Sequence, residues 1–275
     1  MDNKDCIQPI HLEEVFQSKN PRLARMLPGF VYAFLKRLIH VDVINDFIAR
    51  YGDRQGKEFA HAILEFLEVS YDVVGQENLP DKEGRYIFVS NHPLGGPDGI
   101  VLISFLSQYY PELKFPVNDI LLNLKNLNNI FLPVNKHGRF SKEAAEAIEE
   151  AYRSDTQMIM FPAGLVSRKQ SGVVKDLQWQ KSFVTKAVEH HRDVVPIFFS
   201  GHNSSFFYNL ANFRKRIHLK ANIEMLWLPD ETLKNKGQHF TIHIGKPIPY
   251  DTFDNSKKPL DWAAWVKEKV YGMKE

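Results

Sequence analysis

The chain has 275 residues, of which 44% are apolar and 25% are charged, and its formal net charge is +2. This composition indicates a folded globular protein and excludes a largely disordered chain. A net charge so close to zero provides no broad basic surface for nucleic acid, so no nucleic-acid partner is expected.

The single cysteine and the N-terminal sequence bear on the compartment. Cys6 has no second cysteine to pair with, which excludes a disulfide framework and fits a reducing compartment. The first residues, MDNKDCIQPIHLEE, lack the apolar core of a signal peptide. No run approaches the roughly 20 apolar residues that span a bilayer. We therefore expect a cytoplasmic protein that is able to lie on a membrane surface.

Residues 10–70 have the pattern of helices. Apolar residues recur there at three- and four-residue spacing, for example at Phe30, Phe34 and Leu38. The pattern predicts an N-terminal helical segment over residues 1–68.

From about residue 69 onward, strands and helices alternate. Two β-rich runs at 69–75 and 85–90 are separated by a turn-rich stretch. The elements predicted after them are helices at 100–109, 141–153 and 180–190, and strands at 130–134, 157–164, 193–199 and 238–248. This alternation predicts an α/β domain over residues 69–275, with a layered and largely parallel sheet flanked by helices. Ligand sites in such sheets lie at the carboxyl ends of the strands.

One loop at such a strand end has unusual chemistry. The stretch SNHPLGGPDG, residues 90–99, places a histidine directly after a predicted strand. Its two glycines permit a tight reversal, and its second proline suits the first turn of a helix. The reversal brings Asp98 back beside His92, where a carboxylate orients the imidazole as a base. The alternative is that His92 merely ends the strand and Asp98 merely begins the helix.

Four sequence blocks carry a resemblance to a known family. SNHPLGGPDG resembles the His-x4-Asp signature of the glycerolipid acyltransferases, the PlsC-like lysophospholipid acyltransferases. IFLPVN (130–135), FPAGLVSR (161–168) and VVPIFF (194–199) are similar to that family's next three blocks, in the same order and at similar spacing. A bacterial branch with HPLGG-x-DG and FPAG-x-x-SR looks like the O-acyltransferases of lyso-ornithine and lyso-glycine lipids.

The resemblance implies transfer of an acyl group from a thioester to a hydroxyl. His92 would be the general base and Asp98 its orienting carboxylate. Backbone N–H groups of Gly95 and Gly96, or of the following helix N-terminus, would stabilise the oxyanion. Acyl-ACP or acyl-CoA would serve as co-substrate, with no cofactor. No metal is expected, because the eleven histidines show no metal-ligand spacing.

The sequence departs from the family pattern in three places. One extra residue separates His92 from Asp98, Ala163 stands where the family has Glu, and the second block lacks the family's Arg. The last two departures argue against a phosphorylated acceptor. They fit the acceptor that the resemblance to the bacterial branch implies, a lyso-aminolipid whose N-(3-hydroxyacyl) amino acid has a hydroxyl and a carboxylate. The acceptor-binding residues that we infer from these blocks are Phe161, Pro162, Ala163, Gly164, Ser167, Arg168 and Arg139, with Arg168, Lys169 or Lys181 as the cation.

Two other functions stay open at this point. The chain could be a 1-acylglycerol-3-phosphate acyltransferase with a remodelled acceptor site. From another class of protein, it could be an inactive lipid-binding protein that kept the fold after the dyad was stretched.

Two segments are candidates for contact with a membrane. The stretch 212–229, NFRKRIHLKANIEMLWLP, mixes basic and apolar residues, which fits a solvated face or a patch for anionic lipid or an acidic carrier protein. The N-terminal helices carry Phe30, Phe34 and Leu35 beside basic residues, and their alternative role is packing over the α/β core. We expect a peripheral protein on the inner face of the cell membrane.

Overall fold

The computed structural model describes residues 9–19, 21–118, 121–134 and 142–274. Its centre is a seven-stranded sheet with the strand order β1-β9-β8-β2-β5-β3-β4. All neighbouring strands are parallel except β8 and β9, which are antiparallel. The strands are β1 (Ser70–Val74), β2 (Tyr86–Ser90), β3 (Leu113–Val117), β4 (Phe131–Pro133), β5 (Gln157–Met160), β8 (Asp193–Phe199) and β9 (His239–Ile244). The predicted α/β class with a largely parallel sheet is therefore confirmed.

Strand β2 occupies the middle of the sheet, between β5 and β8. All five of its residues are buried, as expected for a parallel strand covered on both faces. Its side chains alternate between two apolar clusters: Phe88 belongs to one, and Ile87 and Val89 belong to the other. The loop that the sequence predicts to be catalytic therefore follows directly after a strand whose five residues are all buried.

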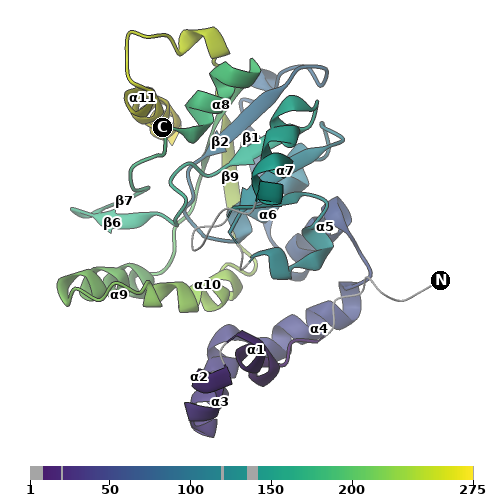
Figure 1. The fold of residues 1–275 in the computed structure, drawn as a ribbon, viewed down its shortest axis with the longest axis vertical. Helices are drawn as coiled ribbons and strands as arrows, with labels where there is room; N and C mark the ends of the chain where they lie inside the picture. Colours follow the sequence, from purple (N-terminus) through teal and green to yellow (C-terminus); the bar gives the residue numbers. More distant parts are fainter. Residues whose placement is uncertain (1–8, 20, 119–120, 135–141, 275) are drawn as a thin grey trace.

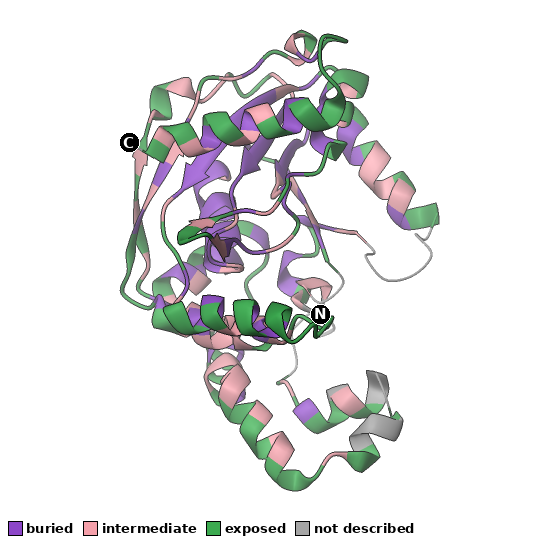
Figure 2. Ribbon diagram, turned by 90° about the vertical axis from the view of Figure 1, so that its left-hand side faces the viewer, coloured by how far each residue is buried: buried purple, intermediate pink, exposed green. Residues whose placement is uncertain are grey.

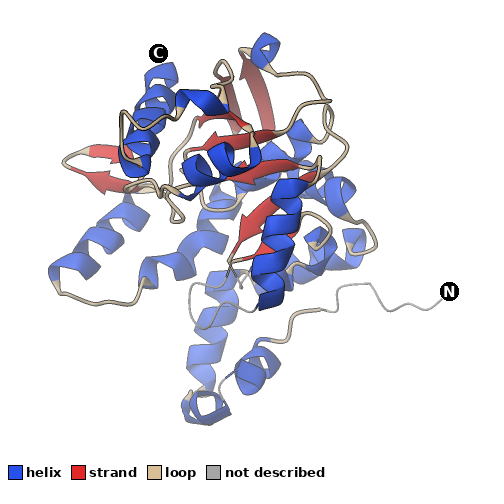
Figure 3. Ribbon diagram, turned by 45° about the horizontal axis from the view of Figure 1, so that its top comes forward, coloured by secondary structure: helices blue, strands red, loops and turns tan. Residues whose placement is uncertain are grey.

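Helices cover both faces of the sheet (Figures 1 and 3). On one face, α5 (Gly56–Phe66) and α6 (Pro97–Leu106) share an apolar cluster with the strands. All ten residues of α6 are buried, because this helix is apolar all round and lies between the sheet and α5. The other face is covered by α7 (Lys142–Arg153), α8 (Ser182–His190) and α11 (Pro259–Tyr271).

The remaining helices lie at one end of the molecule, away from the two covered faces (Figure 1). Four of them precede the sheet: α1 (Leu12–Lys19), α2 (Pro21–Met26), α3 (Gly29–Ile39) and α4 (Val41–Tyr51). Helices α9 (Ser205–Arg216) and α10 (Leu228–Lys234), joined through the 3-10 turn η4 (Ile223–Trp227), lie between them and the sheet. A hydrogen bond of 2.8 Å between Nε2 of His40 and Oδ1 of Asp230 joins the end of α3 to α10.

The N-terminal helices differ from the sheet in burial. In Figure 2 the buried residues concentrate in the sheet and its covering helices, whereas α1 to α4 are mostly exposed or half-buried. None of the helices in the described part of the chain combines the length and the apolar character needed to cross a bilayer.

Candidate active site

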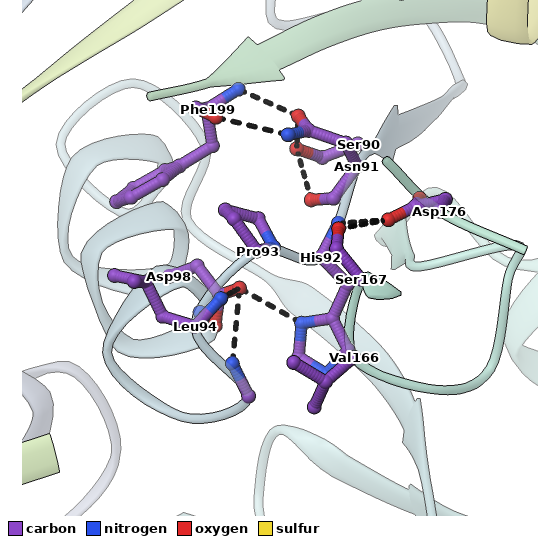
Figure 4. A network of polar contacts seen from close by, with 12 residues as sticks. Ser90, Asn91, His92, Pro93, Leu94, Asp98, Val166, Ser167, Asp176 and Phe199 are labelled. Atoms are coloured by element: carbon purple, nitrogen blue, oxygen red, sulfur yellow. Dashed lines mark hydrogen bonds and ion pairs between the residues drawn. The ribbon is translucent and has the colours of Figure 1, made fainter. Parts of the chain in front are cut away.

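The loop after β2 places His92 and Asp98 in direct contact. The His92 ring Nδ1 lies 2.9 Å from Oδ2 of Asp98, which is the second residue of α6 (Figure 4). The Asp98 side chain is fully buried, while 17% of the His92 side chain is exposed. The extra residue of this loop therefore does not separate the pair. Because Nδ1 is bound to Asp98, Nε2 is the ring nitrogen left to accept a proton from a ligand.

The reversal between the two residues depends on Gly95. Its φ of +88° lies in the left-handed region that favours glycine. A Cβ at this position would lie 2.6 Å from Cγ2 of Val166, so the close approach of the neighbouring loop also requires glycine. Pro97 then occupies the first turn of α6, where a backbone N–H would have no acceptor within the helix, so the missing N–H of proline costs no hydrogen bond.

The carboxylate of Asp98 is held by backbone as well as by His92. Its Oδ2 accepts the N–H groups of Leu94 at 2.9 Å and Gly95 at 3.3 Å. Burial alone raises the pKa of the Asp98 carboxyl, but the charge and hydrogen bond of His92 and these two N–H groups outweigh burial and hold the pKa below its usual value. Asp98 is therefore a carboxylate, able to stabilise an imidazolium.

These hydrogen bonds correct one sequence prediction. The N–H of Gly95 points at Asp98 and is not available to an oxyanion. At the N-terminus of α6, Pro97 has no N–H and the N–H of Gly99 donates to Oδ1 of Asp98 at 3.0 Å, so the N–H groups of Gly96 and Asp98 are the donors of this turn left to consider.

The backbone of His92 is fixed on both sides. Its N–H donates to Oδ1 of Asp176 at 3.2 Å, and its C=O accepts the N–H of Ser167 at 2.8 Å. The preceding residue, Asn91, exchanges two hydrogen bonds with the backbone of Phe199 at the end of β8. Through its side-chain amide, Asn91 thus joins the end of β2 to the end of β8 (Figure 4).

The acceptor loop, residues 161–168, adjoins this histidine. The Phe161 ring stacks on the His92 imidazole, with centroids 4.0 Å apart and planes 16° apart. Ser167 contacts the His92 backbone. The Pro162 carbonyl accepts the N–H of Gln180 at 2.9 Å.

Two small residues of the same loop were also predicted to bind the acceptor. Ala163 is buried, and Gly164 has a left-handed φ of +61°. Both lie within the turn that follows Phe161, whose carbonyl accepts the N–H of Gly164.

The structure places Arg168 differently from its predicted role. Its side chain is buried, and its guanidinium donates to Glu224 at 2.9 Å and to the Val166 carbonyl at 2.7 Å. Arg214 binds the other oxygen of Glu224 at 2.9 Å. Burial lowers the pKa of Arg168, partly offset by the charge of Glu224. Because its guanidinium is already bound, Arg168 is not a free cation for the acceptor. Arg139, another of the predicted acceptor-binding residues, lies outside the described residues.

Several residues that build this site could not be predicted from the sequence. Asp176 lies 84 residues from His92 and belongs to no recognisable motif. Asn203 donates to the carbonyls of Pro93 and Leu94 at 3.3 and 3.2 Å. Glu224 sits in a mixed basic and apolar stretch that suggests a surface, yet it is fully buried. Their partners are distant in sequence, so only the fold reveals them.

One group of side chains in the described ranges has metal-type ligand atoms close together. It consists of Glu149, Glu189 and His190. The Lys186 ammonium contacts both carboxylates. A cation of the protein itself therefore already balances these charges.

Several known proteins are similar to this chain in sequence. The family model described as acyltransferase matches residues 14–275. A lyso-glycine lipid O-acyltransferase of Bacteroides thetaiotaomicron is 47% identical over 97% of this chain and 98% of its own. One of Phocaeicola vulgatus with the same name is 46% identical over 97% of this chain and 96% of its own. The chain belongs to the acyltransferase family.

Among solved structures, the chain is similar to the 1-acyl-sn-glycerophosphate acyltransferase PlsC of Thermotoga maritima. The TM-score is 0.48 at 19% identity, over 88% of this chain and 95% of that one.

Proposed function

We propose that this protein transfers a fatty acyl group from an acyl thioester to the hydroxyl of a lyso-glycine lipid. The observation that carries the proposal is the contact between Nδ1 of His92 and buried Asp98, which leaves Nε2 as the base. The two relatives of that name, similar along nearly the whole chain, support the choice of acceptor. A lyso-ornithine lipid has the same reacting group and is the nearest variant of the proposal.

The chemistry proceeds in one addition and one elimination. Nε2 of His92 accepts the proton of the acceptor hydroxyl while the hydroxyl oxygen forms a bond to the thioester carbonyl carbon. Asp98 stabilises the imidazolium that results. When the carbon–sulfur bond breaks, the thiol leaves with the proton from His92, and an ester remains. The N–H of Gly96 and the α6 N-terminus stabilise the oxyanion in between.

The co-substrate is acyl-ACP or acyl-CoA, and the proposed reaction needs no further cofactor. The acceptor itself provides the nucleophile, so no serine or cysteine nucleophile is involved.

The loop composition favours an aminolipid over a phosphorylated acceptor. Ala163 replaces an acid of the family pattern, and the Arg168 guanidinium is bound to Glu224. The alternative of a 1-acylglycerol-3-phosphate acyltransferase would need other cations for the phosphate. The alternative of an inactive lipid-binding protein is weakened by the dyad, since the extra residue leaves the contact at 2.9 Å.

We also propose that the enzyme works at the inner membrane surface through α3 and α9. Phe30 and Phe34 of α3 and Phe213 of α9 are each more than half exposed. Phe34 and Trp227 line one hollow of about 400 Å³, and the Trp227 ring lies 5.7 Å from that of Phe206, so the two apolar areas adjoin. Exposed basic residues lie on these helices or just after α9, where they can meet anionic headgroups: Lys36, Arg37, Lys215, Arg216 and Lys220.

A vesicle experiment tests the membrane part separately from the chemistry. The Phe213→Ser variant should lose several-fold in binding to vesicles that contain anionic lipid, yet keep its activity in detergent micelles. Val173→Ser, an equally exposed apolar position on a β-hairpin, is the matched control. Equal binding of both variants and the wild type would contradict a docking role for α9.

Acyl transfer is tested with purified protein, acyl-ACP or acyl-CoA, and N-(3-hydroxyacyl)glycine in micelles, with the products read by mass spectrometry. The expected product is the O-acyl ester. An N-acylglycine without the 3-hydroxyl should give no product. The Asp98→Asn variant should lose at least about 100-fold in rate, the lower end of what general base catalysis contributes, because the amide cannot stabilise the imidazolium. Ester formation that is unaffected by this substitution would overturn the dyad.

A further inference from the structure

Asp176 is a second buried carboxylate beside His92, on a different side from Asp98 (Figure 4). It directly follows β7 (Val173–Lys175), which pairs with β6 (Arg168–Gln170) in a short antiparallel hairpin. The side chain of Asp98 contacts the imidazole, whereas that of Asp176 contacts the backbone of the same residue. The two carboxylates therefore hold different parts of one histidine.

Each oxygen of Asp176 has its own donors. Oδ1 accepts the His92 N–H at 3.2 Å and the Ser167 hydroxyl at 2.5 Å. Oδ2 accepts the indole N–H of Trp179 at 2.8 Å. Among the described residues, no Lys, Arg or His side chain lies within ion-pair distance of this carboxylate. Burying a carboxylate costs free energy, and these donors to its oxygens are neutral. The ammonium of Lys267 attracts the carboxylate electrostatically, but it contacts the backbone carbonyl of Asp176 and not its side chain.

The backbone of Asp176 is fixed as firmly as its side chain. Its N–H donates to the Tyr271 hydroxyl at 2.7 Å, and its C=O accepts from the Lys267 ammonium at 2.8 Å. Both partners belong to α11, which packs across the sheet. The carboxylate is thus held against a rigid helix and does not move independently of the core.

We propose that Asp176 is a positioning residue for the acyl transfer described above, and this inference rests on that proposed function. Asp176 and Ser167 together fix the N–H and C=O of His92, so the histidine backbone and the acceptor loop form one rigid unit. The unit sets the direction of Nε2 relative to the place where the acceptor hydroxyl binds. Displacing a catalytic group by about 1 Å lowers the rate on the order of 100-fold, so fixing the position of the His92 ring should matter for the rate.

The test compares Asp176→Asn and Asp176→Ala with the control Asp193→Asn. Asp193 also accepts a backbone N–H, that of Tyr250 at 2.9 Å, but it pairs with Tyr86 at the opposite end of β2. For folded protein we expect kcat to fall roughly 10- to 100-fold in Asp176→Asn and further in Asp176→Ala, with KM for the acyl donor within about threefold. The control should keep both constants.

A double-mutant cycle sharpens the assignment. If Asp176 acts through Ser167, Ser167→Ala should lower kcat in the wild type and have a smaller effect in Asp176→Asn. Folded Asp176→Asn with a kcat within threefold of the wild type would overturn the proposal. So would an equal loss in Asp193→Asn, since that would indicate a general effect of neutralising a carboxylate that accepts a backbone N–H.

A readout that needs no substrate separates this inference from the proposed function. In protein labelled with ¹⁵N-histidine, Asp176→Asn should move the ring nitrogen resonances of His92, and Asp193→Asn should not. Ring resonances that stay in place would refute positioning by Asp176. If the wild type turns over no acceptor at all, the proposed function fails, and these resonances still decide the role of Asp176.

Discussion

The two loops that meet at His92 are built on different principles. In the loop after β2, the bonds to the carboxylate are local: they join His92, Leu94 and Gly95 to Asp98, all within six residues. The side chains of the acceptor loop after β5 bind partners outside that loop: Ser167 binds Asp176, nine residues on, and Arg168 binds Glu224, 56 residues on. In the proposed mechanism the first loop carries the reacting group, and the second holds that group in place. Breaking the first should therefore remove chemistry, whereas breaking the second should loosen structure.

The largest effect is expected at the base itself. His92→Ala removes the proton acceptor but leaves the Asp98 carboxylate held by Leu94 and Gly95. The rate of ester formation should fall about 1,000-fold, the middle of the range for general base catalysis, with little change in KM. Initial rates on protein of unchanged circular dichroism measure this. A loss below tenfold would mean that another group takes the proton.

The second effect tests the acceptor loop through its ion pairs. Glu224→Gln leaves the buried guanidiniums of Arg168 and Arg214 without a counter-charge, which should cost about 3–5 kcal/mol in the free energy of unfolding. Denaturant titration measures the loss. Glu189→Gln, an exposed partner of Lys186, is the control and should change stability by less than about 1 kcal/mol. A similar loss of stability in both variants would show that the burial of Arg168, Glu224 and Arg214 does not increase the contribution of their ion pairs.

The third prediction compares alanine substitutions at two glycines that have nearly the same φ angle. Gly95 has φ +88° and Gly172 has φ +87°, but a Cβ meets Val166 at Gly95 and nothing within 4 Å at Gly172. Gly172→Ala should therefore cost about 1 kcal/mol from backbone strain alone. Gly95→Ala should cost about 1–3 kcal/mol more and also lower the rate, because the turn cannot keep its contact with the acceptor loop. Equal losses of stability would contradict the role of close packing.

The smallest expected effect is the contribution of Asp98 to the pH dependence of the free energy of unfolding. Its folded-state pKa lies below the usual value of 3.8, so its stabilisation is complete above that value and is lost as the pH falls through the folded pKa. The difference in unfolding free energy between wild type and Asp98→Asn should therefore be constant from about pH 7 to 5 and shrink below about pH 4. A difference that grows on acidification would have the wrong sign for this account.

What could be predicted from the sequence follows the same division between the two loops. The parallel sheet and the reversal at His92 were predictable, because strand periodicity and turn chemistry are local. Strand β3 was missed because Lys114 and Pro116 interrupt its apolar pattern. In the basic stretch that includes the end of α9, Arg214 is buried against Glu224 while the next residue, Lys215, is exposed. The composition of the stretch does not predict which of its basic residues is buried.

The function of Asp176 was equally hidden, for a physical reason. A buried carboxylate is recognisable only by its donors, and those of Asp176 come from the β2 end, the acceptor loop and the stretch before α8. Trp179 and Ser167 are close to Asp176 in sequence, but His92 is 84 residues away, and no spacing rule connects it to Asp176. The local motif predicts the reacting residue, and the tertiary contacts show what holds it.

The most direct test of the whole account is a competition between acceptors. Wild-type protein and His92→Ala would each receive one acyl thioester with equal amounts of N-(3-hydroxyacyl)glycine and lysophosphatidic acid in micelles, and mass spectrometry would count both products. The account predicts O-acylated glycine lipid in large excess from the wild type, and almost none from His92→Ala. Phosphatidic acid as the main product, or equal yields from both proteins, would contradict it.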